Sequence, residues 1–333
     1  MHSTVSVVIP AYNSAGVIER ALNSVLAQTY AGIAEVIVVD DGSQDDTAQL
    51  VREMYPGVTL IQQENAGREI ARNVGVDAAS GDYIAFLDHD DEWFPEKTQV
   101  QMACFRACPG LRMTIPDMIL CEDDEQGPGP PQDDGAAPRE PVLEPLTFRR
   151  CFPTVPFHYG CSGWVLERSL FWECGGFRQV THREDREWLW RALFMGYSIA
   201  FVRQPLYHYF GADFRRSAEQ LTRFTLDWYA SLPPIFEDFV DRATRPPARL
   251  TMSEADLKRA EFYWNVGWGL WRVGLPGEAR ASFERSRAFS GTRGLQALGE
   301  RLAISRPDVY DDLLRLRNRF VYMRECIARR LRR

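Results

Sequence analysis

Short, almost wholly apolar segments alternate with segments of helical periodicity over the first 90 residues of the chain. Val5–Ile9 and Val36–Val39 are β-branched runs of the kind that form strands buried on both faces of a sheet. The alternation continues through apolar runs at 58–61 and 83–87, each preceded by a segment with helical spacing. Four strands separated by three helices predict an α/β fold with a doubly wound, mostly parallel sheet flanked by helices.

The pattern changes twice farther along the chain. Residues 122–145 are rich in proline, glycine and acidic residues, which predicts a flexible surface insertion; a lid over the substrate is the alternative interpretation. Beyond Arg245-Pro246-Pro247, which has the composition of a linker, the periodicity is helical and no segment has a strand pattern. We therefore expect an α/β domain over residues 1–240 and an all-helical domain over 250–333.

The end of the chain is strongly basic. Residues 315–333 contain eight arginines and one acid, Glu325, with apolar residues interleaved among them. This pattern predicts a basic amphipathic helix, which could make peripheral contact with an anionic membrane surface. Packing of the same helix on the acidic α/β domain is the alternative interpretation.

The composition narrows the class of protein. A formal net charge of -7 argues against the basic field that nucleic-acid binding requires. The seven cysteines are an odd number without a C-x-x-C pair, so they indicate neither a zinc site nor a disulfide framework and suit a reducing cytosol. We find no basic-then-apolar leader and no run of about 18 apolar residues, and therefore expect a cytoplasmic protein that does not span a membrane.

The sequence Asp88-His89-Asp90-Asp91 directly follows the fourth apolar run. Because side chains alternate along an extended backbone, Asp88 and Asp90 are expected to point to the same side. Two such carboxylates can hold a hard divalent cation, and Mg²⁺ commonly binds through one or two carboxylates together with substrate phosphates. An isolated motif of this kind is more often a solvated acidic turn, so its interpretation depends on its neighbours.

Three segments whose side chains could bind a ligand lie at the same edge of the predicted sheet. Pro10–Asn13, Asp40-Asp41 and Asp88–Asp91 each follow the carboxyl end of a strand. Ligands of doubly wound sheets bind beyond those ends, where the connections diverge. The convergence of the three segments therefore predicts a binding crevice and favours a functional role for the acidic motif.

Together these segments resemble the family 2 glycosyltransferases, which have the GT-A fold. The likeness continues through Glu184-Asp185 and Pro205-Leu206-Tyr207 to about residue 210. It implies a mixed, mostly parallel sheet, a nucleotide-sugar donor, a divalent cation (Mg²⁺ or Mn²⁺) and a reaction that inverts the sugar. The stretches that carry the likeness are Val7–Asn13, Ser24–Tyr30, Val38–Ser43, Glu64–Gly67, Ala71–Gly75 and Phe86–Asp91.

The resemblance implies a pocket for the nucleotide, in which Asp41 would accept a hydrogen bond from the base ring. Arg72 matches a family position near the nucleotide, although it could equally pair with Asp88 or Asp41 in a structural role. The residues implied to contact the nucleotide are Pro10, Ala11, Tyr12, Asp41, Arg72 and Asp88.

The resemblance also implies a metal site. Asp90 would ligate the cation that bridges the diphosphate, and Asp88 would contact the ribose or a metal-bound water. Many family members carry Tyr-Arg-x-His after the last strand, whereas here Tyr209 is followed by Phe210-Gly211. His208, Arg215 or Arg216 could replace the missing basic and imidazole contacts to the diphosphate. For His208 we expect either a role as third metal ligand or that of a hydrogen-bonded structural histidine.

Transfer to a hydroxyl group requires a general base, because the hydroxyl is a poor nucleophile until its proton leaves. Glu184 and Asp185 are the two candidates. Thr181 and Glu184 match a capping box at a helix start, which gives Glu184 a structural role and makes Asp185 the better candidate. Direct displacement from the face opposite the leaving group would invert the configuration of the sugar.

The sequence thus predicts a metal-dependent, inverting transferase that moves a sugar, in particular from a UDP-sugar, to a glycan or lipid-linked acceptor. One alternative is a non-catalytic nucleotide-binding scaffold whose helical tail binds a partner; the intact acidic residues argue against it. Another is a sugar nucleotidyltransferase, which would need a Gly-rich loop with a basic residue after the first strand. A dinucleotide-dependent oxidoreductase is disfavoured because no G-x-G-x-x-G follows that strand.

Overall fold

The computed structural model of this chain has two units, Met1–Leu221 and Thr222–Arg333. The domain limits expected from the sequence, 1–240 and 250–333, stay predictions. Residues 122–140 of the predicted acidic insertion, Arg215, Arg216 and the whole basic segment 315–333 lie outside the described residues. The structure describes residues 3–121, 141–151, 160–179, 184–210, 233–245, 250–272 and 275–290.

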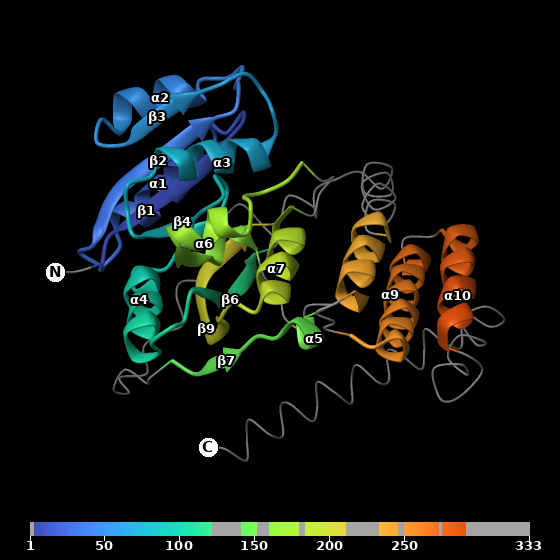
Figure 1. Cartoon of the computed structure of the whole chain (residues 1–333). Coiled ribbons are helices and arrows are strands. Elements are labelled where there is room, and N and C mark those ends of the chain that lie inside the picture. The colour runs from blue at the N-terminus through green and yellow to red at the C-terminus, as the bar shows by residue number, and fades with distance from the viewer. Residues whose placement is uncertain are drawn as a thin grey trace, which may run out of the picture. The chain divides into compact units, whose positions relative to one another are not determined.

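The four apolar runs of the amino-terminal segment form neighbouring parallel strands, as predicted (Figure 1). β1 (Val5–Ala11) lies between β2 (Ile33–Asp40) and β4 (Tyr83–Phe86), and β3 (Thr59–Gln62) pairs with the outer side of β2. Every residue of β1 is buried, as expected for a strand that is covered on both faces. The carboxyl ends of these strands therefore share one edge of the sheet.

The two faces of β1 pack against different helices. Val5, Val7 and Ile9 join a core that includes residues of α1 (Ile18–Leu26) and α2 (Thr47–Met54). On the other face lies α3 (Arg68–Ala78), where a Cβ atom at Gly75 would come within 2.3 Å of the Val8 side chain. Because only glycine fits at this contact, α3 can rest directly on the sheet.

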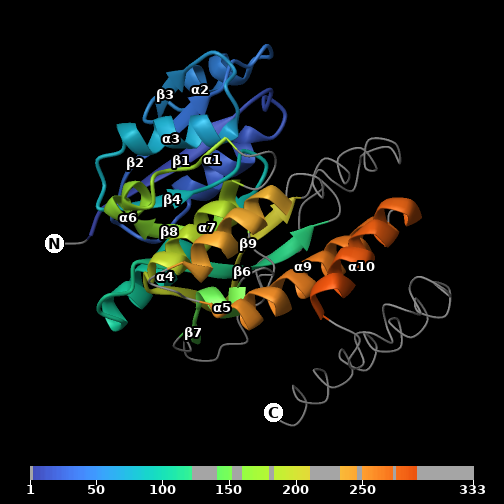
Figure 2. The ribbon, with the colours of Figure 1, turned by 45° about the vertical axis from the view of Figure 1, so that its right-hand side comes forward.

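The second half of the sheet is mixed (Figure 2). β8 (Val165–Glu167) is antiparallel to β4 and to β6 (Met113–Cys121), whereas the long β9 (Ile199–Phe210) is parallel to β6. β5 (Glu92–Trp93) pairs antiparallel with β9 at the end of the sheet. The predicted mixed sheet flanked by helices is confirmed, although β5, β6 and β8 were not expected from the sequence.

One segment differs from the sequence-based expectation. The predicted flexible insertion at 122–145 includes Leu143–Pro145. In the structure these three residues form β7, which pairs antiparallel with β9. The apolar run at 199–202 and the segment at 205–209 belong to one strand. The register between β9 and β6 shifts just before Pro205, a residue that has no backbone N–H to donate to a regular ladder.

An aromatic cluster joins the remaining helices of this unit to the sheet. Phe86 of β4 packs against Phe171 in α6 (Arg168–Glu173), and Phe171 stacks on Trp188 in α7 (Glu184–Met195). On the opposite face, α4 (Lys97–Ala107) contributes Met102 and Phe105 to the core of β1. The short α5 (Phe148–Cys151) lies against α7. The cluster fixes α7, whose first turn carries Glu184 and Asp185.

The described part of the second unit contains helices and no strand: residues 233–244, α9 (Met252–Arg272) and α10 (Pro276–Ser290). α9 and α10 approach closely, because a Cβ atom at Gly267 would lie 2.8 Å from the Phe283 ring. The predicted helical extension is thus confirmed. None of the helices in the described ranges is both long and apolar enough to cross a membrane.

Lys97 carries an unusual buried amine. Its side chain is fully buried, Nζ donates to Gln101 Oε1 at 2.8 Å, and the same atom lies 3.8 Å from the centre of the Trp93 ring. Burial lowers the pKa of Lys97 well below its usual value. The unfolded chain therefore binds this proton more tightly, so the unfolding free energy should rise with pH until about pH 10.4, the pKa of an exposed lysine.

We predict that Lys97→Met changes the free energy of unfolding at pH 7 by less than about 2 kcal/mol, because the cost of burying the amine is removed while the buried Gln101 Oε1 loses its donor. The variant should also lack the rise in stability towards high pH, which denaturant unfolding at several pH values would measure. Lys258→Met is the control, because Lys258 is 21% exposed, and it should change stability by less than about 0.5 kcal/mol. An unchanged pH dependence in Lys97→Met would contradict the prediction.

Candidate functional site

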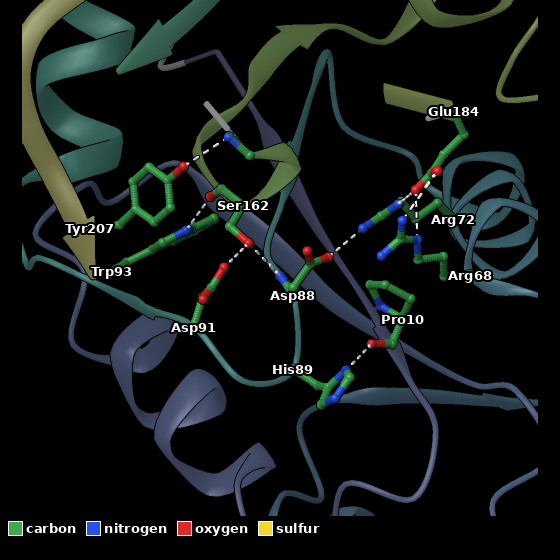
Figure 3. A network of polar contacts seen from close by, with 11 residues as sticks. Pro10, Arg68, Arg72, Asp88, His89, Asp91, Trp93, Ser162, Glu184 and Tyr207 are labelled. Carbon is green, nitrogen blue, oxygen red and sulfur yellow. Dashed lines mark hydrogen bonds and ion pairs between the residues drawn. The ribbon is translucent and has the colours of Figure 1, made fainter. Parts of the chain in front are cut away.

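The acidic loop that follows β4 is fixed to the end of β1 (Figure 3). His89 donates from Nδ1 to the Pro10 carbonyl at 3.2 Å. Arg20 on α1 donates from Nη2 to the Asp90 carbonyl at 2.5 Å. The loop that carries Asp88 and Asp90 and the loop after β1 therefore lie together at one edge of the sheet, as the strand pattern predicts.

A buried arginine connects the acidic loop to helix α7 (Figure 3). Arg72 on α3 pairs with Asp88 Oδ1 at 2.5 Å through Nη2 and with Glu184 Oε1 at 2.8 Å through Nη1. Arg68, one helical turn earlier, lies 2.7 Å from the same Glu184 oxygen. Arg72 and Glu184 are each 2% exposed, whereas Arg68 is 53% exposed. Two cations and two anions thus join three segments that are far apart in the sequence.

These ion pairs determine the charge of both carboxyl groups. Burial by itself would raise the pKa of Asp88, but the Arg72 guanidinium outweighs burial and holds that pKa below its usual value. Burial would also raise the pKa of Glu184, and Arg72 and Arg68 together lower it below the usual value. Both carboxyl groups are therefore ionised at neutral pH.

Asp90 has a different environment from Asp88. Within the described ranges its carboxylate forms no ion pair and accepts no hydrogen bond from another residue. Burial raises the pKa of Asp90; His89 and Arg20 oppose this rise in part, and the neighbouring Asp88 charge adds to it. A partly buried carboxylate without an ion-pair partner suits a divalent metal ion, and Asp88 offers a second oxygen donor in the same loop.

The described side chains alone do not make a complete metal site. No three histidine, cysteine, aspartate or glutamate side chains in the described ranges are grouped around a common point. A divalent cation at Asp90 and Asp88 would therefore take further oxygen ligands from water or from a bound phosphate, as Mg²⁺ commonly does. The two carboxylates fit a metal of that kind.

Asp41 joins the ends of two strands to the segment before α3. Its Oδ1 accepts hydrogen bonds from the Gln63 side chain at 2.6 Å and from the Ala66 N–H at 2.9 Å, and its Oδ2 accepts one from the Gly67 N–H at 2.9 Å. The Asp41 N–H donates to the Ala11 carbonyl at 2.8 Å. The buried Asp41 carboxylate therefore also fixes the position from which α3 begins.

The loop after β1 has an uncommon backbone conformation. Asn13 has a φ of 49°, in the left-handed region that asparagine tolerates better than most residues. Its N–H donates to Ser43 Oγ at 2.9 Å, and its Oδ1 accepts from the Gln44 N–H at 2.8 Å. The neighbouring Tyr12 side chain is 43% exposed, and its ring is available for stacking on a planar ligand.

Glu184 and Asp185 begin α7 but have different environments. The Glu184 carboxylate is buried between Arg72 and Arg68. Asp185 is partly exposed, its Oδ1 accepts the Arg186 N–H at 2.6 Å, and its charge influences the pKa of Arg68. Asp185 thus lies close to the ion-pair chain, whereas Thr181, the predicted capping partner of Glu184, lies outside the described residues.

His208 lies in β9, opposite Glu92 of β5. Its Nδ1 is 3.0 Å from Glu92 Oε2, and its ring packs edge-on against Phe94 at 4.7 Å between ring centres. Its Nε2 is buried and has no hydrogen-bond partner in the described part of the chain. Since the structure does not group His208 with Asp88 and Asp90, its role as a third metal ligand stays a prediction.

The structure brings most of the predicted site residues together. Pro10 contacts the acidic loop through His89, Ala11 contacts Asp41, and Arg72 contacts both Asp88 and Glu184. The sequence left open whether Arg72 pairs with Asp88 or with Asp41, and the partner is Asp88. The functional roles of all these residues stay predictions.

Ser162 is a participant that the sequence did not reveal. It lies in a short 3-10 helix (Cys161–Gly163), and its hydroxyl oxygen accepts the Asp88 N–H at 3.0 Å. The one signal in the sequence is the pair of glycines, Gly160 and Gly163, on either side, since glycines often mark a close backbone approach. A Cβ atom at Gly163 would indeed lie 2.8 Å from the Tyr207 ring.

Comparison with known proteins gives the family. Residues 6–175, about half of the chain, match the family model described as "Glycosyl transferase family 2". The uncharacterized glycosyltransferase YibD of Escherichia coli (strain K12) is 39% identical over 107 residues, which are 31% of this chain and 31% of that protein. The amylovoran biosynthesis glycosyltransferase AmsB of Erwinia amylovora is 27% identical over 286 residues, 78% of this chain and 90% of that protein.

Two groups of solved structures resemble the fold. The mannosyltransferase PcManGT from Pyrobaculum calidifontis, solved with GDP-Man and Mn²⁺, has a TM-score of 0.56 at 22% identity over 94% of this chain and 83% of that one. TarS 1-349 of S. aureus, solved with UDP-GlcNAc, has a TM-score of 0.51 at 20% identity over 87% of this chain and 91% of that one. The fold is therefore that of the GT-A glycosyltransferases. Within this class, the chain belongs to glycosyltransferase family 2.

We predict that Arg72→Met destabilises the fold by about 3–5 kcal/mol, because it leaves Asp88 as a poorly solvated carboxylate without an ion-pair partner among the described residues and leaves the buried Glu184 with Arg68 alone. Arg68→Met is the matched change on the same helix. Because Arg68 is half-exposed, its loss should cost less than about 1 kcal/mol. Urea unfolding of both variants at pH 7 would measure the difference, and equal losses would contradict the prediction.

The pH dependence of these variants is a second check. In the wild type, the lowered pKa values of Asp88 and Glu184 contribute stability that is present above their unfolded pKa of about 4 and is lost as the pH falls through the folded values. Without Arg72, burial should raise the pKa of Asp88, so its protonation would favour the folded state, whereas Arg68 still pairs with Glu184. The stability gap between wild type and Arg72→Met should therefore narrow between pH 7 and pH 4 or so.

Proposed function

We propose that this protein is a metal-dependent, inverting glycosyltransferase that moves a sugar from a nucleotide donor to a hydroxyl group of a glycan or lipid-linked acceptor. The observation that carries the proposal is the ion-pair chain through Arg72, because it links the acidic loop to the helix start that bears Asp185. Arg72 thus fixes the distance between the acidic loop, proposed to bind the leaving diphosphate, and the helix start that carries the proposed base. Membership in glycosyltransferase family 2 supports this proposal.

Asp90 and Asp88 are the residues proposed to hold Mg²⁺ or Mn²⁺. When bound, the ion would stabilise the negative charge that the nucleoside diphosphate gains as its bond to the sugar breaks. The Asp90 carboxylate forms no ion pair with a described side chain, which suits this role, and the presence of Mn²⁺ with GDP-Man in the PcManGT structure supports it.

Asp185 is the residue proposed as general base. It would take the proton of the acceptor hydroxyl while the hydroxyl oxygen forms the new bond to the anomeric carbon. The electron pair of the old bond would leave with the diphosphate, and attack from the opposite face would invert the carbon. Glu184 is less suited to this role, because two arginines favour its charged form and so weaken its affinity for a proton.

The proposed donor is a UDP-sugar. Its nucleotide would be bound by Pro10, Ala11, Tyr12, Asp41 and Asp88, and Arg72 would hold Asp88 in place through their ion pair. An ionised carboxylate has about four acceptor positions. Three positions on Asp41 are taken by Gln63, Ala66 and Gly67. The one that remains suits the single ring N–H of uracil better than the two adjacent N–H donors of guanine, and the TarS structure with UDP-GlcNAc is consistent with this choice.

The proposed acceptor is a glycan or a lipid-linked sugar, in keeping with the name of the relative AmsB, an amylovoran biosynthesis glycosyltransferase. We propose that the protein acts in the cytoplasm. The basic segment 315–333, outside the described residues, would make peripheral contact with the inner face of the cell membrane.

Thermal stabilisation by nucleotide-sugars tests the donor and the metal together. We expect a UDP-sugar with Mn²⁺ to raise the Tm by roughly 3 °C or more, and to do so more than a GDP-sugar with Mn²⁺ or the same UDP-sugar with EDTA. Asp90→Asn should keep the Tm of the unliganded protein and lose the Mn²⁺-dependent shift. If no nucleotide-sugar stabilises the protein, the proposed function is wrong. If the Tm shift persists in EDTA, the proposed metal dependence is wrong.

The two candidate bases can be separated by kinetics. We expect Asp185→Asn to lower kcat at least about 10²-fold while donor affinity changes little, because the base acts only in the chemical step. Glu184→Gln should instead lower the Tm, since it breaks the pairs with Arg72 and Arg68. A 10²-fold loss in Glu184→Gln at unchanged Tm, with Asp185→Asn still active, would reverse the assignment.

A further inference from the structure

The hydroxyl of Ser162 connects two residues of the acidic loop (Figure 3). Ser162 Oγ accepts the backbone N–H of Asp88 at 3.0 Å and contacts the Asp91 carboxylate at Oδ2. Ser162 and Asp91 are both fully buried. Neither side chain is exposed to solvent, so their roles are confined to contacts within the protein.

The donor and acceptor roles in this connection follow from the number of protons. A serine hydroxyl has one proton and two lone pairs. One lone pair of Ser162 Oγ takes the Asp88 N–H, so the hydroxyl proton is left for the Asp91 carboxylate. The other oxygen of Asp91 accepts the Phe210 N–H at 2.9 Å, which prevents the carboxylate from turning away.

The backbone that carries Ser162 is itself held from several sides. Trp93 Nε1 donates to the Ser162 carbonyl at 2.6 Å, and the Gln101 side-chain amide donates to the Gly163 carbonyl at 2.9 Å. The Gly160 N–H donates to the Tyr207 hydroxyl oxygen at 3.1 Å. The backbone around Ser162 is therefore held in place and cannot easily move with the acidic loop, so the hydroxyl group can fix the position of Asp88.

Asp88 and Asp90 depend on this frame to different degrees. The Asp88 carboxylate is also held by Arg72, so its position has a second support. No described side chain holds the Asp90 carboxylate, so its direction follows from the loop backbone, which is fixed at the Asp88 N–H and at the Asp90 carbonyl. Loss of the Ser162 hydroxyl should therefore be felt most strongly at Asp90.

We propose that Ser162 is a positioning residue of the metal loop. Its hydroxyl, oriented by Asp91, fixes the backbone at Asp88 and so aims the Asp88 and Asp90 carboxylates at a divalent cation. This inference rests on the proposed function, because it assumes that these two carboxylates bind the metal. The structure offers a second serine with the same bonding pattern and no connection to the site.

That second serine is Ser6, which is fully buried at the opposite end of β1. Its hydroxyl donates to Glu35 Oε1 at 2.6 Å and accepts the Gly81 N–H at 2.9 Å. Ser6→Ala therefore removes the same kind of hydroxyl, bonded to one carboxylate and one backbone N–H, without touching the acidic loop. The pair of variants separates a general loss of stability from a loss of metal positioning.

The test is the affinity for Mn²⁺ in the presence of UDP, measured by electron paramagnetic resonance of the full-length protein, with the Tm recorded for each variant. We expect Ser162→Ala to bind Mn²⁺ about tenfold more weakly than the wild type, and Ser6→Ala to bind it within about twofold, although both lower the Tm. Amide hydrogen exchange at Asp88 should be faster in Ser162→Ala alone.

The outcomes distinguish failure of the positioning role from failure of the proposed function. If wild type binds Mn²⁺ and Ser162→Ala binds it equally well, the positioning role is wrong while the proposed function stands. If wild type does not bind Mn²⁺ with UDP, the metal-dependent function fails and this inference fails with it. If Ser162→Ala does not fold, Ser162→Thr and Ser162→Val provide two variants of equal shape that differ in the hydroxyl group. The proposal holds only if the Ser162→Val protein binds Mn²⁺ about tenfold more weakly than the Ser162→Thr protein.

Discussion

The burial of Arg72 is the constraint on which the rest of the site depends. A guanidinium that is almost fully removed from water is stable only beside anions that compensate for its lost hydration. Its two anions, Asp88 and Glu184, come from the loop after β4 and from the start of α7. Arg72 can therefore be buried only when these segments have docked on α3, so the formation of the site is part of the formation of the fold.

The same constraint gives two neighbouring acids different properties. Successive residues of an α-helix are about 100° apart around its axis, so a helix that directs Glu184 towards Arg72 directs Asp185 elsewhere. Glu184 then serves as a counter-ion whose proton affinity is lowered by two arginines. Asp185 keeps some exposure to solvent and stays within the electrostatic reach of the chain. A single helix start thus places a structural acid and an accessible acid side by side.

The sequence predicts what depends on local patterns and misses what depends on distant partners. The β-branched runs and their helical separators predicted β1 to β4, and the topology of a parallel sheet then predicted that Pro10, Asp41 and Asp88 would meet at one edge. The partner of Arg72 could not be chosen, because Asp88 and Asp41 are equally compatible with its position on a helix. Ser162 was missed for the same reason: its contact with Asp88 spans 74 residues of sequence.

That long-range contact nevertheless has a simple geometric cause, the register of one short antiparallel pair. In the β4–β8 ladder Ala85 is paired with Val165, and the Phe86 N–H donates to the Trp164 carbonyl one step farther on. Asp88 lies three residues after Ala85, and Ser162 lies three residues before Val165. An antiparallel register carried past the end of the strands therefore places the two residues opposite each other. The reversal of direction at β8, which breaks the parallel sheet, is what brings a hydroxyl group to the backbone of the acidic loop.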